Sequence, residues 1–293
     1  MLTEIVIGVG ILAGLGLLFA TVIAIAYRKF RVYEDPRIDE VEEMLPHANC
    51  GACGLPGCRA FAEKVVGQEI QPSKCTVSSA EAIQRIAAYL GVEAGAEEKR
   101  VARLLCAGGR REAHNLADYK GTMSTCRGEA AVAGGSKACS WGCLGLGDCE
   151  IACDFDAIFM NEDGLPEVIP DLCTACGDCV KACPKGLFEL MPLSQKLIVQ
   201  CKSLLEGEEA ESRCSVACTA CGRCVADAPD GLIAIRNNLA VINYELNHLA
   251  SVDATFRCPT RAIVWVESEQ FIKPAAPVLP VGRVERYGEE YYQ

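Results

Sequence analysis

Four closely spaced cysteines constrain this chain more than any other feature of its sequence. They lie in CTACGDCVKACPKG, residues 173–186, which has the spacing C-x2-C-x2-C-x3-C-P. The cysteines are Cys173, Cys176, Cys179 and Cys183, and Pro184 follows the last. A disulfide framework does not require this spacing, whereas an iron–sulfur cubane takes three thiolates from one tight loop and a fourth from elsewhere. The run therefore predicts an iron–sulfur protein.

The composition supports ligation by thiolate. The chain has 293 residues with 20 Cys, 3 His and a net charge of -11. With so few histidines, imidazole ligation of zinc or haem explains little of the cysteine count. The acidic balance argues against nucleic-acid binding, because phosphates repel an acidic surface.

An uncharged apolar run of 23 residues, Ile5–Tyr27, lies near the start of the chain, after Glu4. It is long enough for one transmembrane helix with some tilt. Gly10 and Gly14 form a G-x-x-x-G pair, which lets a neighbouring helix approach closely. The same spacing also arises by chance in a glycine-rich apolar run, so this role stays open.

The charges that flank the run predict its orientation. Arg28, Lys29 and Arg31 follow it directly, and the positive-inside rule then places the cysteine-rich part in the cytoplasm. A cleaved signal peptide is the alternative, since Ala24-x-Ala26 resembles a cleavage site, but a basic region before the apolar run is missing. A reducing cytoplasm keeps thiolates available as ligands and makes disulfides rare.

A second cysteine set follows the anchor with the spacing C-x2-C-x4-C-x16-C. Its members are Cys50, Cys53, Cys58 and Cys75. Three cysteines within nine residues and a distant fourth favour a cubane, with structural zinc as the alternative. Helices are predicted over residues 59–66 and 80–91.

The motif LPHANCGACGLPGC, together with one N-terminal apolar helix, the basic residues after it and the ferredoxin motifs, resembles the B subunit of the Rnf electron-transport complex (the RnfB/RsxB family). The resemblance covers most of residues 1–267. It implies a component of a membrane translocase that couples electron flow between ferredoxin and NAD to ion translocation. The implied partners are the other Rnf subunits, soluble ferredoxin and the membrane.

The second half of the chain contains a duplication with an offset of 75 residues. CSWGCLGLGDC at 139–149 corresponds to CSVACTACGRC at 214–224. At this offset five cysteines have a counterpart: Cys126 and Cys201, Cys139 and Cys214, Cys143 and Cys218, Cys149 and Cys224, and Cys183 and Cys258. Each copy is therefore predicted to be a ferredoxin-like module stabilised by its clusters.

The first copy is predicted to hold two clusters, because the fourth cysteine of each run serves the other run's cluster. One ligand set is Cys153, Cys173, Cys176 and Cys179. The other is Cys143, Cys149, Cys183 and one more, since Leu146 occupies the usual middle position. Cys139 is the first choice for that ligand and Cys126 the second.

The second copy is predicted to hold one cluster, on Cys218, Cys221, Cys224 and Cys258. The counterparts of the other ligand set are Ala228, His248, Ser251 and Ala254, none of which carries sulfur. That site has therefore been lost, and about four [4Fe–4S] clusters remain in the whole chain. Cys106, Cys126, Cys201 and Cys214 are left over; they are buried small side chains or alternative ligands, and a further cluster stays possible.

The predicted fold is α+β. Its parts are a transmembrane anchor at 1–27, a 4Fe–4S domain at 34–92, a linker at 93–125, a two-cluster module at 126–192, a one-cluster module at 201–267 and a tail at 268–293. No catalytic triad or nucleotide-binding glycine motif is visible, so the chain is expected to carry electrons without a complete active site of its own. A complex that keeps an iron–sulfur transcriptional regulator reduced is the alternative, and a scaffold with purely structural clusters is a third hypothesis.

Overall fold

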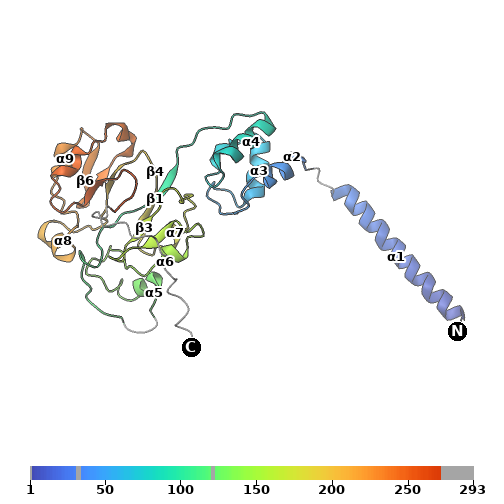
Figure 1. The fold of residues 1–293 in the computed structure, drawn as a ribbon. Coiled ribbons are helices and arrows are strands. Elements are labelled where there is room, and N and C mark those ends of the chain that lie inside the picture. Colours follow the sequence, from blue (N-terminus) through green and yellow to red (C-terminus); the bar gives the residue numbers. More distant parts are fainter. Residues whose placement is uncertain (1, 31–33, 120–122, 272–293) are drawn as a thin grey trace, which may run out of the picture. The chain divides into compact units, whose positions relative to one another are not determined.

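The computed structural model describes residues 2–30, 34–119 and 123–271 (Figure 1). The chain divides into two compact units, Met1–Gly95 and Ala96–Gln293. Arg31, one of the charges that predict the orientation, and most of the expected C-terminal tail lie outside the described residues.

Helix α1, Leu2–Phe30, contains the apolar run (Figure 1). Of the described residues, Val6–Phe30 form one helix that is long and apolar enough to cross a membrane. Its large side chains are exposed, Leu12 by 73% for example, as a lipid-facing helix requires. The helix extends beyond the apolar run to Phe30. The positive charges of Arg28 and Lys29 lie in its last turn and complement the helix dipole.

The remainder of the first unit is a small helical domain. Its helices are α2 (Arg37–Glu43), α3 (Cys58–Val66), the 3-10 helix η1 (Pro72–Lys74) and α4 (Ala80–Leu90). The helices predicted at 59–66 and 80–91 are confirmed. Apolar residues spaced one turn apart, among them Phe61, Val65 and Ile86, form its buried core. Ser79 accepts a hydrogen bond from the Ala82 N–H at the start of α4, and Gly91 ends the helix in the left-handed conformation.

The first ferredoxin-like module contains two two-stranded sheets, one formed by its first and last strands and one formed by the hairpin between them. Strands β1 and β4 are antiparallel, as are β2 and β3. The elements in chain order are β1 (Arg100–Leu104), α5 (Cys126–Ala131), α6 (Asp148–Ile151), β2 (Ile158–Met160), β3 (Pro166–Val168), α7 (Asp178–Ala182) and β4 (Phe188–Pro192).

The second module repeats this arrangement. Strand β5 pairs with β8 and β6 with β7, all antiparallel. The elements are β5 (Leu197–Val199), α8 (Gly207–Arg213), α9 (Arg223–Asp227), β6 (Ile233–Arg236), β7 (Leu239–Ile242), the 3-10 helix η2 (Tyr244–Leu249), α10 (Asp253–Phe256) and β8 (Ile263–Trp265).

The first strands of the two modules do not follow the 75-residue offset. Phe188 and Ile263 stand 75 residues apart and pair with Leu104 and Val199, which stand 95 residues apart. The first module therefore has 20 additional residues between its first strand and its first cysteine loop. This longer connection contains α5 and Cys126.

Two expected boundaries differ from the structure. The segment expected to be a linker, 93–125, supplies β1, so the first module begins before residue 126. The expected tail begins inside the fold: the Leu104 N–H donates to Gln270 Oε1 at 2.9 Å, and Gln270 is buried. Local composition does not predict the pairing of β1 with β4 or the bond between Leu104 and Gln270. Both join segments more than 80 residues apart in the chain.

The two modules share a buried contact. Leu105, Met191, Ile198 and Val266 form one apolar cluster with partners from both outer strand pairs. Beside it the Ala107 N–H donates to the Gln200 carbonyl at 3.1 Å, which joins the segments that follow β1 and β5. The modules therefore pack together at the ends of their first strands, within one compact unit.

Candidate metal centres

Four pockets are each lined by four cysteines. Their cavity volumes are similar, about 340, 360, 340 and 300 Å³, which suits one kind of occupant at all four sites. The cysteine sets are Cys50, Cys53, Cys58 and Cys75; Cys126, Cys143, Cys149 and Cys183; Cys218, Cys221, Cys224 and Cys258; and Cys153, Cys173, Cys176 and Cys179.

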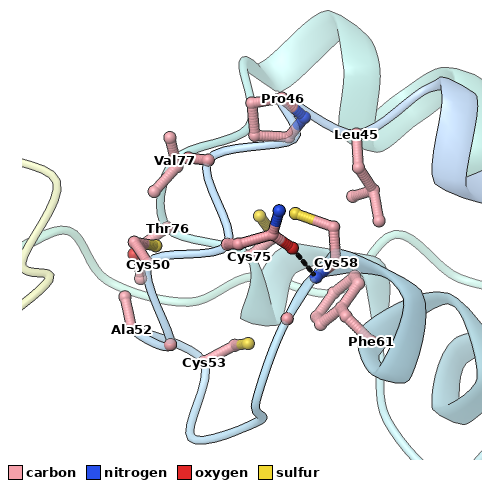
Figure 2. A pocket seen from close by; sticks show the side chains of 14 residues that line it. Leu45, Pro46, Cys50, Ala52, Cys53, Cys58, Phe61, Cys75, Thr76 and Val77 are labelled. Atoms are coloured by element: carbon pink, nitrogen blue, oxygen red, sulfur yellow. Dashed lines mark hydrogen bonds between the residues drawn. The ribbon is translucent and has the colours of Figure 1, made fainter.

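The pocket of the N-terminal unit lies between a glycine-rich loop and the start of α3. Figure 2 shows the side chains of Cys50, Cys53, Cys58 and Cys75 gathered around it. The Cys58 N–H donates to Asn49 Oδ1 at 2.8 Å, the dashed line in Figure 2. This bond satisfies an N–H at the beginning of α3 and holds the loop against the helix.

Gly57 is required at this place for a steric reason. A Cβ on Gly57 would lie 2.8 Å from Asn49 Oδ1, closer than side-chain carbons approach oxygen. Gly51 and Gly54 have φ of 70° and 84°, a conformation that favours glycine. The glycines of this motif therefore let the backbone wrap closely around the space between the thiols.

The three loops of the ferredoxin-like modules share one backbone path. The residue two positions after the first cysteine has φ of 58° at Ala175, 56° at Ala220 and 76° at Gly145. The glycine two positions later, just before each short helix, has φ between 72° and 85° in all three loops. Leu146 therefore occupies the backbone position that Cys176 and Cys221 occupy in the other two loops.

Cys126 is the fourth cysteine at the pocket whose loop has Leu146 in its middle position. It lines the pocket with Cys143, Cys149 and Cys183, whereas Cys139 does not. The choice of Cys139 as the fourth ligand thus differs from the structure, and Cys126, the second choice, is the residue brought to the site.

Asp148 positions Cys126. Its Oδ1 accepts a hydrogen bond from the Cys126 N–H at 2.8 Å, and its Oδ2 accepts one from the Arg127 N–H at 3.1 Å. The carboxylate thereby caps the first N–H groups of α5, where a negative charge is favourable. In the second module the position of Asp148 holds Arg223, and no residue equivalent to Cys126 is needed there.

The second module has filled the site whose cysteines it lacks. Ala254, the counterpart of Cys179, is 1% exposed and belongs to the core of this module. Ala228, the counterpart of Cys153, packs against the same core. Apolar packing thus stands where the first module has a cysteine-lined pocket.

The pocket cysteines are buried among one another, which disfavours their ionised form. The pKa of Cys143 is raised to about 12, mainly by burial and next by the neighbouring thiol of Cys106. Burial likewise raises the pKa of Cys179 to about 12 and of Cys224 to about 11, with the other cysteines of each pocket as the next cause. Grouped thiolates of this kind need a multiply charged cation to be stable.

The donor sets fit iron–sulfur clusters. In the part of the chain that the structure describes, no three His, Cys, Asp or Glu side chains are grouped around a point where a single ion would bind. Four thiols spread around a larger space are what a cubane requires. Backbone N–H groups also point at sulfur, from Ala102 to Cys173 and from Leu187 to Cys183, both at 3.5 Å. Such bonds stabilise bound thiolate.

Comparison with protein families agrees with these sites. Residues 45–77 match the family described as "Putative Fe-S cluster", and Leu45 and Val77 are also the first and last residues that line the first pocket. Residues 135–190 and 172–233 match two families described as 4Fe-4S dicluster domains. The expected α+β fold with several [4Fe–4S] clusters is confirmed.

The chain is similar to B subunits of ion-translocating oxidoreductase complexes along most of its length. It is 48% identical over 245 residues to the B subunit of the Na(+)-translocating ferredoxin:NAD(+) oxidoreductase complex of Acetobacterium woodii, covering 84% of this chain and 73% of that one. It is 38% identical to the proton-translocating counterpart of Clostridium ljungdahlii, covering 85% and 88% of the two chains. It is 37% identical to the B subunit of the ion-translocating oxidoreductase complex of Methanosarcina acetivorans, covering 87% and 96%.

The chain belongs to this family of B subunits. The resemblance inferred from its motifs is therefore confirmed. Sequence reasoning placed Cys126 second to Cys139 because spacing alone favours the nearer cysteine. The signal that identifies Cys126 is Asp148, a carboxylate at the start of the short helix in a loop that lacks its middle cysteine.

Proposed function

We propose that this chain is the iron–sulfur electron-transfer subunit of a membrane complex that couples electron flow between ferredoxin and NAD to ion translocation. The observation that carries the proposal is the presence of four cysteine-lined pockets in a chain of this family. The relatives are named as subunits of ion-translocating complexes. These names do not favour the alternative, a complex that keeps an iron–sulfur transcriptional regulator reduced.

The cysteine sets that line the four pockets are the proposed cluster ligands. Cys126 replaces Cys139 in the second set, because Cys126 lines that pocket and Cys139 does not. When bound, the clusters supply reversible one-electron transfer, at potentials near roughly -400 mV where ferredoxins operate. The chain's own residues hold the clusters and direct N–H groups at their sulfurs.

The division of the chain into two units supports a division of labour. The two ferredoxin-like modules receive electrons from soluble ferredoxin, and the small domain next to α1 passes them to the membrane subunits. Sequence proximity to the anchor is the argument for the second assignment. A flavin-bearing partner is then needed for hydride transfer to NAD, because hydride chemistry takes two electrons at once.

The membrane arrangement follows from α1 and its flanking charges. A single crossing by α1 with Arg28 and Lys29 on the inner side leaves the cysteine-rich part in the cytoplasm, where ferredoxin is present. An acidic chain of this kind is not expected to bind nucleic acid. Protease added to intact cells should leave residues beyond 34 uncut, and cleavage there from outside contradicts this arrangement.

The test of function is a redox titration of the anaerobically purified complex, followed by electron paramagnetic resonance. Several one-electron steps at low potential are expected, whereas structural clusters would hold one oxidation state throughout. Cys58→Ala should remove the first cluster and abolish ferredoxin-to-NAD turnover while ferredoxin still reduces the modules. Wild-type turnover in this variant contradicts the proposed route.

A further inference from the structure

Four cysteines line none of the four pockets, and all four are buried. They are Cys106, Cys139, Cys201 and Cys214, with exposed fractions of 7%, 8%, 9% and 6%. Free cysteines often fill cores as small apolar side chains, so burial alone does not indicate a ligand. Their arrangement does.

The four cysteines are two pairs related by the duplication. The Cys143 N–H donates to Cys106 Sγ at 3.4 Å, and the Cys218 N–H donates to Cys201 Sγ at the same distance. Cys143 and Cys218 are counterparts at the 75-residue offset, so Cys106 is the structural counterpart of Cys201. The expected correspondence of Cys126 with Cys201 is therefore corrected to Cys106 with Cys201. The reason is that the first module has 20 additional residues between its first strand and its first cysteine loop.

The second pair keeps the 75-residue offset. Cys139 and Cys214 correspond in sequence, and both belong to the buried core that also contains Cys201. Each module therefore contributes one cysteine from the end of its first strand and one that precedes its first cysteine loop.

The pairs meet where the modules pack together. The hydrogen bond from the Ala107 N–H to the Gln200 carbonyl places the residues beside Cys106 and Cys201 next to each other. A Cβ on Gly108 would lie 2.8 Å from Cys214 Sγ and 3.9 Å from Cys106 Sγ. Sulfurs from both modules therefore face the same small region, which only a glycine leaves open.

The thiols are also close enough to affect one another's ionisation. The pKa of Cys214 is raised to about 11, mainly by burial, and the thiols of Cys106 and Cys139 contribute to that rise. Burial is also the main cause that raises the pKa of Cys201, and the thiols of Cys218 and Cys106 act in the same direction.

A buried cation accompanies these cysteines. Lys137 is 8% exposed, and its Nζ donates to the Gly108 carbonyl at 2.5 Å. Its charge acts on Cys106 and Cys214 in the direction that favours their thiolates. A buried ammonium is costly in a purely apolar core, whereas it stabilises an anionic group beside it.

We propose that Cys106, Cys139, Cys201 and Cys214 hold a fifth [4Fe–4S] cluster at the contact between the two modules. The set matches the four pocket sets in the number and kind of its side chains, four thiols each, and four thiolates are what a cubane requires. Each thiol releases its proton as it binds iron. Since the neighbours Cys143 and Cys218 line two of the pockets, the cluster lies between those two centres. The site does not depend on the direction or partners of electron flow.

The test is a cluster count on the full-length chain, purified anaerobically in detergent. Iron and acid-labile sulfide are measured together with native mass spectrometry, and iron-57 Mössbauer spectra identify the type of centre. About twenty irons per chain are expected, against about sixteen for four cubanes. A count of sixteen in the wild-type chain overturns the proposal, as does one zinc or one mononuclear tetrathiolate iron per chain.

Variants identify the residues. Cys106→Ser and Cys214→Ser should each remove about four irons, and the double variant should remove no more than either alone, since both hold one cluster. Combining Cys106→Ser with Cys75→Ser is the matched control, because those residues serve separate sites and about eight irons should be lost. Losses that add for the pair Cys106 and Cys214 overturn the shared site, and a wild-type iron count in both single variants does so too.

Discussion

The backbone N–H of Ala102 donates a hydrogen bond to Sγ of Cys173, which stands 71 residues further along the chain. The bond connects β1 to a cysteine of the loop at 173–179. The residue that follows, Arg103, is buried, and its Nη1 donates to the Ser268 carbonyl at 3.1 Å. Among the described residues its Nε and Nη2 have no hydrogen-bond partner. A buried positive charge thus stands close to one proposed cluster.

Arg103 should set the potential of that cluster. Burial lowers the pKa of Arg103 and the Cys173 thiolate raises it, yet a guanidinium stays charged in proteins. Since reduction makes a cluster more negative, a nearby cation favours the reduced form. Arg103→Met should lower the midpoint potential of the cluster on Cys173 by roughly 60 mV, a tenfold change for a one-electron couple. A redox titration followed by paramagnetic resonance measures it.

Two controls separate charge from packing. Arg103→Lys keeps the charge and should leave the potential near that of the wild type. Arg100→Met removes an exposed cation from the same strand, and solvent screening should leave its effect small. Equal shifts in Arg103→Met and Arg103→Lys contradict the electrostatic role.

Asn49 should control how firmly the N-terminal cluster is held. Asn49→Ala removes the acceptor of the Cys58 N–H and places alanine at a φ of 47°, which costs about 1–3 kcal/mol for the unmet N–H. The first cluster should then be lost faster to an iron chelator, and about four irons should leave ahead of the rest. Gly57→Ala should act in the same direction, because its Cβ meets Asn49 Oδ1.

Asn243→Ala is the matched control for this prediction. Asn243 Oδ1 accepts the Glu245 N–H at 3.2 Å in the second module, remote in sequence from the first cluster. Its variant should release iron at the wild-type rate. Unchanged release in both Asn49→Ala and Gly57→Ala shows that this hydrogen bond does not hold the cluster.

Cysteine spacing in the sequence predicts which residues form three of the cysteine loops. Which cysteines from elsewhere in the chain lie beside those loops depends on long-range packing. The loops at 50–58, 173–179 and 218–224 are complete in the sequence, because three ligands on one tight turn fix their own geometry. The repeat offset aligned Cys126 with Cys201, whereas the structure aligns Cys106 with Cys201, because the first module is longer than the second before its first cysteine loop. A repeat offset carries no information about where such an insertion lies, and the pairing of β1 with β4 is visible only in the structure.

The boundaries of the domains were predictable only where local sequence signals mark them. The pattern around residues 80–91 was sufficient for α4, since an N-cap serine and a C-terminal glycine are local signals. Residues 100–104 were expected to belong to a linker and form β1 instead; RVARL is short and its partner strand lies 88 residues further along. Local periodicity cannot distinguish such a strand from a loop.

Asp148 should be necessary for Cys126 to reach its cluster. Asp148→Ala leaves the N–H groups of Cys126 and Arg127 without their acceptor, which should cost about 1 kcal/mol or more at the start of α5. The chain should then lose iron from this site faster under chelator. Asp148→Asn keeps an acceptor and should retain most of the iron. Glu208→Ala, which removes an exposed carboxylate from the first turn of α8 in the second module, is the control and should behave as the wild type.

Leu146→Cys should rescue the loss of Cys126. Cys126→Ser alone should remove about four irons, because Cys143, Cys149 and Cys183 keep only three thiolates. The backbone at Leu146 follows the path it has at Cys176 and Cys221, with φ of 76° at Gly145 and 81° at Gly147. A thiol at 146 therefore starts from the position of the middle ligand in the other two loops.

The double variant Cys126→Ser with Leu146→Cys should recover those irons, measured by iron and sulfide analysis of the anaerobic chain. Leu144→Cys in the same background is the control and should not recover them, since position 144 corresponds to Thr174 and Thr219, beside the first cysteine. Full iron content in Cys126→Ser alone, or no recovery with Leu146→Cys, contradicts the assignment of Cys126 as the ligand that replaces the missing middle cysteine.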